Sequence, residues 1–300
     1  MKQSLGNQTG DLLPSLVFGS LCFVWGSTWL AIKVGLNTLP PLTFAGVRFI
    51  IAWGLLLVYA LATKTRFPKD KASWRLMLFL GLVQISIPYA LTFWGEQYMT
   101  SGLTALLFAT LPFFVVVFAH FMVPGESVTT WKLAGMLISF VGVAIIFSGQ
   151  LLFTPGAFWG GVALVASAGC GGYANVVGKK YSQSIHPVAN VVVQSGVGAI
   201  VLTMTGLALE RSAPMVFDQA SIFAILYLAV FGSAYGFVSL YWLFTRMEVT
   251  KIALFTFITP IVAVLLGWFM LSEALDTSAA VGGSLILIGI VIVNRAPSRH

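Results

Sequence analysis

The sequence predicts an all-α integral membrane protein with ten transmembrane helices, arranged as two inverted five-helix repeats. Three observations lead to this prediction: a very apolar composition, long apolar runs between charged residues, and a second half that repeats the first. Hydrophobic residues make up 58% of the 300-residue chain and charged residues 8%, with a mean hydropathy of +0.95. A soluble domain has about 25% charged residues. We therefore expect the chain to lie in a lipid bilayer.

The apolar runs are long enough to cross that bilayer. A helix rises about 1.5 Å per residue, so about 20 residues span the hydrocarbon. Ending the helices at Pro, Gly and polar breaks predicts spans at 12–35, 40–62, 75–95, 101–123, 131–148, 157–178, 187–209, 220–244, 249–272 and 277–294. Five spans fall in each half, which predicts a first repeat at 12–148 and a second at 157–294.

The second half repeats the first at an offset of 146 to 148 residues. The matched rare residues include Gly26 with Gly172, Lys33 with Lys179, Trp94 with Trp242, Pro112 with Pro260, and Glu126 with Glu273. With five spans per repeat, the second copy enters the bilayer from the opposite side, so the halves are inverted. Inverted repeats place a binding site near the midplane and allow alternating access by rocking of one half against the other.

The basic residues predict the orientation. With a cytoplasmic amino terminus, thirteen of the sixteen Lys and Arg residues lie in cytoplasmic segments, Lys33 and Arg211 lie outside, and Arg48 lies within the second span. The positive-inside rule therefore places both termini in the cytoplasm and the protein in the inner or plasma membrane. The net charge of +7 then reflects orientation and contact with anionic headgroups, and we expect no nucleic-acid partner.

The stretch Trp25-Gly26-Ser27-Thr28-Trp29, followed by Pro40-Pro41 and Gly46-Val47-Arg48-Phe49, resembles the start of EamA-type proteins of the drug/metabolite transporter superfamily. The segments 112–142 and 260–289 look like the ends of the two EamA repeats. The resemblance implies a secondary transporter, usually an exporter of small metabolites, amino acids or toxic analogues. It also implies a cavity lined mainly by helices 1 to 4 and 6 to 9.

The second copy departs from the family pattern in two places. Gly171-Gly172-Tyr173 replaces the Trp-Gly-Ser run, and Gln194 replaces Arg48. We expect substrate choice to depend on these unequal positions, whereas Gly26 and Gly172 belong to the shared scaffold.

Arg48 is the one basic residue well inside a predicted span. An unpaired cation in hydrocarbon costs at least about 2.5 to 3.5 kcal/mol, so Arg48 should face protein or water. Two roles remain open. The guanidinium can bind a substrate carboxylate or phosphate bidentately, or it can snorkel or hold helix carbonyls in place.

Other polar and aromatic residues at membrane depth are candidates for lining the site. Amphipathic rings with a few amides and hydroxyls suit amino-acid-like or aromatic molecules. Besides Arg48, the expected substrate-binding residues are Trp25, Ser27, Thr28, Gln84, Tyr89, Trp94, Thr110, Tyr173, Asn175, Gln194, Tyr235, Tyr241 and Thr256, with Ser233 as a further candidate. Singly, each can instead be structural, through bonds to its own helix or membership of an interfacial belt. Asn175 and Gln194 are favoured because an amide in lipid must find a partner.

Pro112 and Pro260 lie near the middle of the fourth helix of each repeat, where proline removes a backbone hydrogen bond and kinks the helix. The matched kinks are either hinges or fixed features that shape the cavity.

The glycine pairs 135/142 and 282/289 are each seven residues apart, which is two turns on one helix face, so we expect close packing of helices 5 and 10.

All nine acidic residues fall in loops or at predicted helix ends, and we expect Glu96 to be solvated. This distribution argues against a buried-carboxylate relay and favours facilitated exchange or weakly coupled export. We expect no cofactor and no metal, because the three His and two Cys residues lack ligand spacing and no Walker loop occurs. The chain is therefore not expected to be an enzyme. The alternatives are a channel-like protein and a membrane-embedded enzyme without a recognisable motif.

The expected partners are a small-molecule substrate and the lipid bilayer, with the protein a monomer or a weak homodimer.

Overall fold

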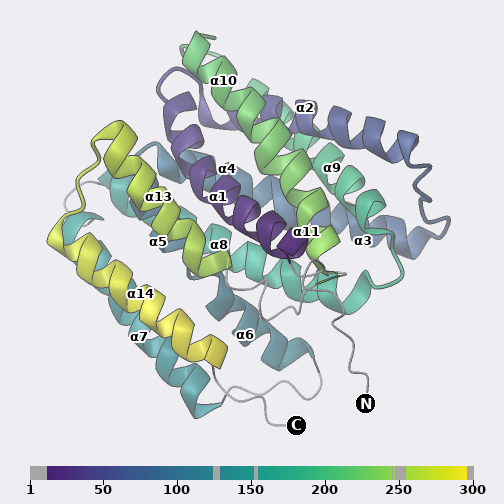
Figure 1. The fold of residues 1–300 in the computed structure, drawn as a ribbon. Helices are drawn as coiled ribbons and strands as arrows, with labels where there is room; N and C mark the ends of the chain where they lie inside the picture. The colour runs from purple at the N-terminus through teal and green to yellow at the C-terminus, as the bar shows by residue number, and fades with distance from the viewer. Residues whose placement is uncertain (1–11, 124–128, 152–154, 245, 247–254, 296–300) are drawn as a thin grey trace.

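The computed structural model describes residues 12–123, 129–151, 155–244, 246 and 255–295 (Figure 1). The described residues form helices and connecting turns, with no strand among them, which confirms the all-α prediction. The α-helices are α1 (Leu12–Gly35), α2 (Pro41–Ala62), α3 (Lys71–Leu80), α4 (Ile87–Glu96), α5 (Ser101–Phe108), α6 (Leu111–Met122), α7 (Thr130–Ile146), α8 (Pro155–Tyr181), α9 (Pro187–Leu209), α10 (Gln219–Tyr227), α11 (Gly236–Phe244), α13 (Phe255–Leu271) and α14 (Thr277–Arg295). The π-helical segments are η1 (Gly81–Ser86), η2 (Phe147–Leu151) and η3 (Leu228–Tyr235).

Eight continuous helical stretches are long and apolar enough to cross a membrane. Four of them are composite: α3, η1 and α4 make one span, α5 and α6 another, α7 and the start of η2 a third, and α10, η3 and the start of α11 a fourth. Two shorter apolar helices, Ile258–Leu271 and Thr277–Val293, occupy the positions of the last two predicted spans. The chain is therefore an integral membrane protein, while the count of ten spans stays a prediction.

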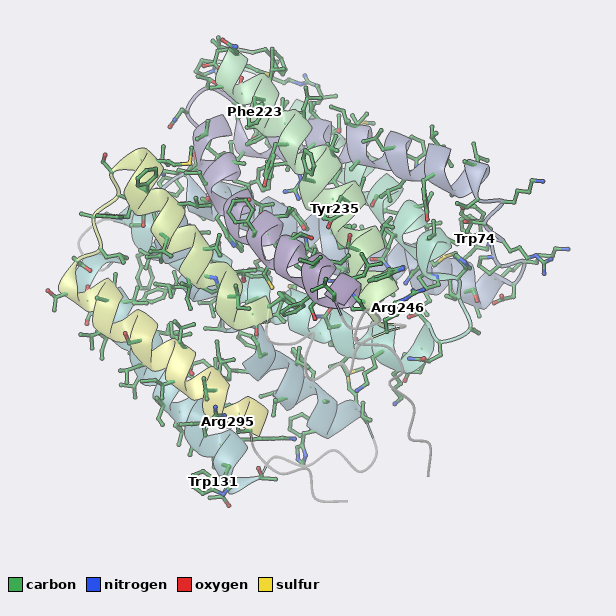
Figure 2. All side chains as sticks on the ribbon, viewed as in Figure 1. Trp74, Trp131, Phe223, Tyr235, Arg246 and Arg295 are labelled. Atoms are coloured by element: carbon green, nitrogen blue, oxygen red, sulfur yellow. The ribbon has the colours of Figure 1, made fainter. Side chains whose placement is uncertain are left out.

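One end of the helix bundle is referred to below as the Lys33 end. It contains the last turn of α1, the first turns of α2 and α5, and the last residue of α4. Contacts hold these termini together: Lys33 Nζ donates to the carbonyl of Glu96 at 3.2 Å, and the Leu42 N–H donates to the Glu210 carboxylate at 2.8 Å. Arg246 and Arg295 lie away from Phe223, which marks the Lys33 end in Figure 2.

The helices α7 and α14 lie side by side in Figure 1 and run antiparallel. A Cβ at Gly135 would lie 2.6 Å from the carbonyl oxygen of Gly289, and a Cβ at Gly142 would clash with the carbonyl of Gly282. The absence of side chains at these four positions lets the two backbones touch. The predicted close packing of this glycine pattern is confirmed.

The second and seventh predicted spans also pack antiparallel, as α2 against α9. A Cβ at Gly46 would meet the Thr203 side chain and backbone, and a Cβ at Gly206 would meet those of Thr43. The contacts pair later residues of α2 with earlier residues of α9, which shows that the two helices run antiparallel. Each glycine also leaves space for a threonine of the other helix.

Gly26 and Gly172 also provide close helix contacts. A Cβ at Gly26 would lie 2.5 Å from Cβ of Val262 on α13, and one at Gly172 would lie 2.7 Å from Cβ of Phe114 on α6. These contacts agree with the predicted scaffold role of both glycines, which stays a prediction. Each lets the first helix of one half approach the fourth helix of the other.

The two matched prolines have different effects. Before Pro112 the helix is interrupted, because α5 ends at Phe108 and α6 begins at Leu111. Pro260 instead lies inside an unbroken α13. The π-helical segments η1 and η3 fall at matching places in the two halves and were not predicted. A π-helix adds a residue to a turn and often accompanies a functional site.

Candidate functional site

Arg48 lies in a buried cluster between α2, α4 and η3. Its side chain is 2% exposed, and Nε donates to the Ser233 hydroxyl at 3.2 Å. The guanidinium carbon lies 5.3, 5.0 and 5.8 Å from the ring centroids of Phe49, Tyr89 and Phe93. We call these five residues the Arg48 cluster. It joins α2 to α4, and through Ser233 it reaches the second half of the chain.

These contacts bear on the two predicted roles of Arg48. A cation over an aromatic ring gains about 0.5 to 2 kcal/mol, and a hydrogen bond to a charged group about 1.5 to 3 kcal/mol, so the ring contacts and Ser233 offset much of the burial cost. The side chain does not snorkel, because rings enclose it, and its acceptor among the described residues is a hydroxyl and not a helix carbonyl. Neither snorkelling nor a bond to a helix carbonyl is seen among these contacts, and substrate binding stays a prediction.

The guanidinium keeps donors available. Arginine has five N–H groups, and among the described residues the Ser233 hydroxyl accepts from Nε and the Tyr89 side chain forms a further hydrogen bond, so some of the N–H groups stay available. No described carboxylate forms an ion pair with Arg48. Gly232 leaves room for the terminal nitrogens, since a Cβ there would lie 3.2 Å from Nη2. The cluster therefore presents a cation with free N–H groups among aromatic rings.

The predicted residues of α1 fix that helix against η3 and α10. Trp25 Nε1 donates to the carbonyl of Gly232 at 3.1 Å. The hydroxyls of Ser27 and Tyr227 lie 2.5 Å apart, and the buried Thr28 bonds back to the carbonyl of Trp25 at 2.6 Å. The side chain of Thr28 also borders Gly232 beside Arg48. These residues lie next to the Arg48 cluster and hold the glycine that makes space for it.

Tyr235, labelled in Figure 2, makes a similar contact about two turns away along α1, with its hydroxyl 2.5 Å from that of Ser20. It therefore also fastens η3 to α1.

Three other predicted residues make local or packing contacts elsewhere. The Gln194 amide donates to Asn190 one turn earlier on α9 at 2.8 Å, so the amide has the partner that burial requires. Thr110 bonds back to the carbonyl of Leu107, and Tyr173 packs edge-on against Phe118 and Phe79. No described contact joins these three to Arg48.

The remaining predicted residues are more peripheral. Trp94 is 36% exposed, and Asn175 is exposed on α8, so the amide partner expected for Asn175 is not found among its described neighbours. Gln84 is half-buried in η1, and Thr256 is half-buried at the start of α13. The side chain of Tyr241 lies outside the described residues.

The expectation that Glu96 is solvated is wrong. Its side chain is 0% exposed, and neither carboxylate oxygen has a hydrogen-bond partner. Lys33 donates to the main-chain carbonyls of Glu96 and Gln97, at 3.2 and 3.4 Å, and not to the carboxylate. Tertiary packing of α1 and α8 against the end of α4 covers a residue that its position at a helix end made look exposed.

In contrast to Glu96, the Glu273 carboxylate has hydrogen-bond donors. Its carboxylate accepts from the Ser101 N–H at 2.9 Å and the Ser101 hydroxyl at 2.8 Å, at the N-terminus of α5. A carboxylate at a helix N-terminus gains from the helix dipole. Glu273 therefore stabilises the start of α5.

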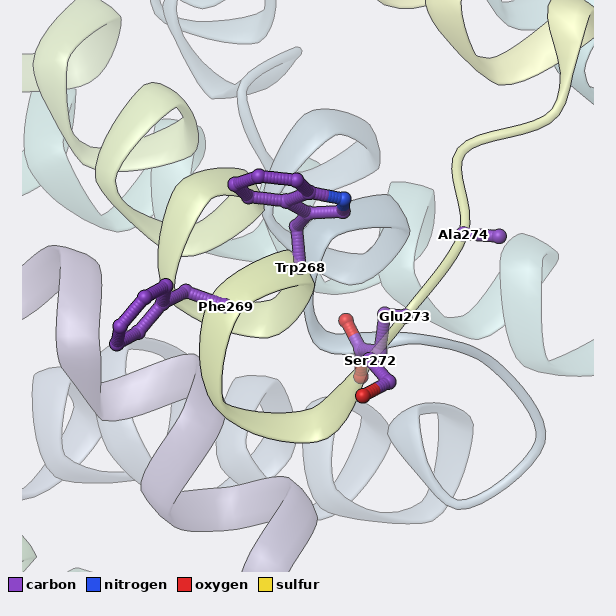
Figure 3. A pocket seen from close by; sticks show the side chains of 5 residues that line it. All are labelled: Trp268, Phe269, Ser272, Glu273 and Ala274. Carbon is purple, nitrogen blue, oxygen red and sulfur yellow. The ribbon is translucent and has the colours of Figure 1, made fainter.

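Two shallow pockets adjoin Glu273. The first, of about 350 Å³, is lined by Trp268, Phe269 and the 272–274 loop, and Figure 3 shows the two rings projecting from α13 in directions different from Glu273. The second, of about 420 Å³, is lined by residues including Lys33, Gln97 and Glu273. Neither contains Arg48, so both are features of the Lys33 end and separate from the Arg48 cluster.

The burial of Glu96 could have been predicted from the spacing of residues on α4. Tyr89, Phe93 and Glu96 are spaced four and three residues apart, so they share one face of α4. Phe93 is buried and Tyr89 half-buried against Arg48, so Glu96 on the same face points to the interior as well. The π-helical segments left no comparable periodic signal.

Comparison with known proteins identifies the family. The model of the EamA-like transporter family matches residues 14–148 and again 158–295. The chain belongs to this family. The resemblance given by the WGSTW stretch and the repeated Pro, Glu and Gly residues is therefore confirmed.

Relatives of this EamA-like protein are named transporters. The chain is 29% identical to the uncharacterized transporter YvbV of Bacillus subtilis, covering 98% of this chain and 94% of that protein. It is 25% identical to the uncharacterized transporter YoaV of the same organism, covering 90% and 93%. It is 27% identical to the uncharacterized inner membrane transporter YedA of Escherichia coli, covering 94% and 91%.

A solved structure described as a crystal structure of a protein superposes with a TM-score of 0.64 at 18% identity, covering 93% of this chain and 96% of that one. This likeness supports the fold. Among the described residues, no group of three His, Cys, Asp or Glu side chains is placed to hold a metal ion.

Proposed function

We propose that this EamA-like protein is a secondary transporter that exports small organic metabolites carrying a carboxylate, amino acids or their analogues above all, by alternating access. The observation that carries the proposal is the Arg48 cluster. A buried guanidinium with free N–H groups and no protein carboxylate suits an anionic group, and the surrounding rings suit an apolar side chain.

The site has partners from both halves of the chain. Arg48 and Tyr89 belong to the first half, and Ser233 and Gly232 to the second. A rocking movement between halves would therefore change the surroundings of the guanidinium, which is what alternating access requires. The antiparallel pairs α2–α9 and α7–α14 support the proposed inverted relation between the repeats.

The orientation belongs to the same proposal. Among the described basic residues, Lys33 and Arg211 lie near the Lys33 end, and those of the α2–α3 connection, α7, the end of α8 and Arg246 lie toward the other. By the positive-inside rule the Lys33 end faces outward and both termini are cytoplasmic. The export direction follows the family resemblance.

A counterflow assay in proteoliposomes tests the proposal. Liposomes loaded with one unlabelled solute should accumulate its labelled form when the solute is an amino acid or benzoate, with saturation, and not when it is benzyl alcohol. Arg48→Gln should lower apparent affinity about 10- to 100-fold, the value of one charge-assisted hydrogen bond. Arg211→Gln, at an exposed arginine, is the matched control and should exchange normally. Equal exchange by the wild type and Arg48→Gln would contradict the role of Arg48.

A further inference from the structure

Glu96 is a buried ionisable group with no assigned part in the proposed site. Both carboxylate oxygens lack hydrogen-bond partners, and the side chain has no exposed surface. An ionised carboxylate in such surroundings is costly unless a cation or donors compensate, and a structural carboxylate normally has those donors. Glu273 and Glu210 show the usual arrangement, since each accepts main-chain N–H groups at the start of a helix.

The charges around Glu96 come from three elements. Lys33 on α1 and Arg48 on α2 are the cations near enough to act on it electrostatically, and Glu273 after α13 is the neighbouring carboxylate. On α4 itself, Tyr89 is the other titratable group of the inward face. The packed segments of α8 and α5 contribute no charged side chain there, within the described part of the chain. Neither cation forms an ion pair with Glu96, so its charge is balanced only at a distance.

A pocket at the Lys33 end lies near this group. The pocket of about 420 Å³ is lined by Lys33 and by Gln97, the residue next to Glu96. Lys33 Nζ bonds to the main-chain carbonyls of both residues from the pocket wall. Glu96 itself does not line the pocket, but its neighbour in sequence does, so a small movement at this end would connect the carboxyl to solvent.

Arg48 and Glu96 lie against the same face of α4. Phe93 stands between them along that face, with the guanidinium carbon 5.8 Å from its ring centroid. The positive charge of Arg48 favours the ionised carboxylate, and an anion bound to Arg48 cancels that effect. Anion binding and proton binding should therefore reinforce each other, and linkage makes the effect reciprocal.

We propose that Glu96 is the proton-binding site of this transporter, and that an anionic substrate on Arg48 and a proton on Glu96 bind together. The carboxylate takes up the proton when the site opens to the cytoplasm, becomes the neutral acid, and releases the proton toward the Lys33 end with the exported substrate. A monocarboxylate anion such as benzoate and the proton then move as an electroneutral pair, whereas a zwitterionic amino acid and the proton move with one net positive charge. This inference rests on the proposed function, and it replaces the facilitated exchange or weakly coupled export that the positions of the acidic residues suggested.

Proton uptake on ligand binding tests the coupling. Purified protein in weakly buffered detergent is mixed with benzoate, and a pH indicator reports protons taken up between about pH 5 and about pH 9 while calorimetry reports binding. The wild type should take up as much as about one proton per bound benzoate at the most favourable pH. Glu96→Gln should still bind benzoate with no uptake. Glu210→Gln, which alters a hydrogen-bonded carboxylate near the same end, should behave as the wild type.

The outcomes separate the two proposals. Benzoate binding without proton uptake in the wild type, or equal uptake by Glu96→Gln, would overturn the proton site and leave the Arg48 site standing. Infrared difference spectra provide a second measurement that needs no ligand. The wild type should show a protonated-carboxyl band that changes with pH and is absent from Glu96→Gln. If that band is missing, the proton site is wrong even where benzoate fails to bind and the Arg48 site fails with it.

Discussion

In the first half of the molecule, α2 carries Arg48 among three aromatic rings, whereas the matching position of α9 in the second half carries Gln194, which bonds one turn back to Asn190. A similar contrast holds at the Lys33 end. The first half buries Glu96 at the end of α4, and the sequence has Phe244 at the equivalent place. Both buried charged residues therefore belong to the first of the two repeats.

The scaffold itself is shared much more evenly. Gly26 and Gly172 each admit a helix of the opposite half, and the pairs of glycines on α7 and α14 contact one another. The π-helical segments η1 and η3 fall at matching places. Close backbone contacts occur in both copies because each pair of packed helices needs them. A single buried charge is enough to form a site, and a second would add the cost of burying another charge.

The largest effect is expected where the halves are most alike. Gly142→Val and Gly282→Val each place a branched side chain against the backbone of the partner helix, so each should lower the free energy of unfolding by about 3 kcal/mol. Thermal unfolding in detergent measures the loss. Gly54→Val is the control, because a Cβ at Gly54 meets nothing within 4 Å. If only one of these two variants lost stability, the equivalence of α7 and α14 would be contradicted.

An intermediate effect is expected at the matched prolines, where the halves differ. The helix is interrupted before Pro112 and continuous through Pro260, so Pro112→Ala should slow counterflow several-fold and Pro260→Ala should change it little. Exchange rates at saturating solute provide the comparison, with unfolding temperature measured in parallel. Equal slowing by the two variants would instead favour a shared role, either as hinges or in shaping the cavity.

The smallest effect is expected at two exposed caps that match across the halves. Asp70 and Asp218 accept the main-chain N–H of Ser73 and Ser221, each at 2.7 Å, and these bonds hold the pKa of both carboxyls below the ordinary value of 3.8. A lowered pKa in the folded state adds stability above the unfolded value, and this stability is lost as the pH falls through the folded pKa.

Both variants Asp70→Asn and Asp218→Asn should therefore leave the unfolding temperature nearly unchanged at pH 7, since Asn also caps helices, and should reduce its fall below about pH 4. The unfolding temperature measured from neutral to acid pH checks this. Opposite pH responses of the two variants would break the correspondence between the caps.

The sequence by itself determined the membrane class, the family and the scaffold. Apolar run length, the repeated Pro and Glu residues, and the spacing of Gly135 with Gly142 are local or periodic properties that a bilayer converts directly into helices and close contacts. It also identified Arg48 as the exceptional residue, because a cation inside a span has few possible surroundings.

Only the tertiary structure decided which side chains surround that cation and which predicted residues lie elsewhere. Arg48 meets Ser233 across 185 positions of sequence, and α2, α4 and η3 must pack before the cluster exists. The burial of Glu96 has the same origin. A helix end is exposed or covered according to its neighbours. The packing of α1 and α8 against α4 buries Glu96, which its position in the sequence had suggested was solvated.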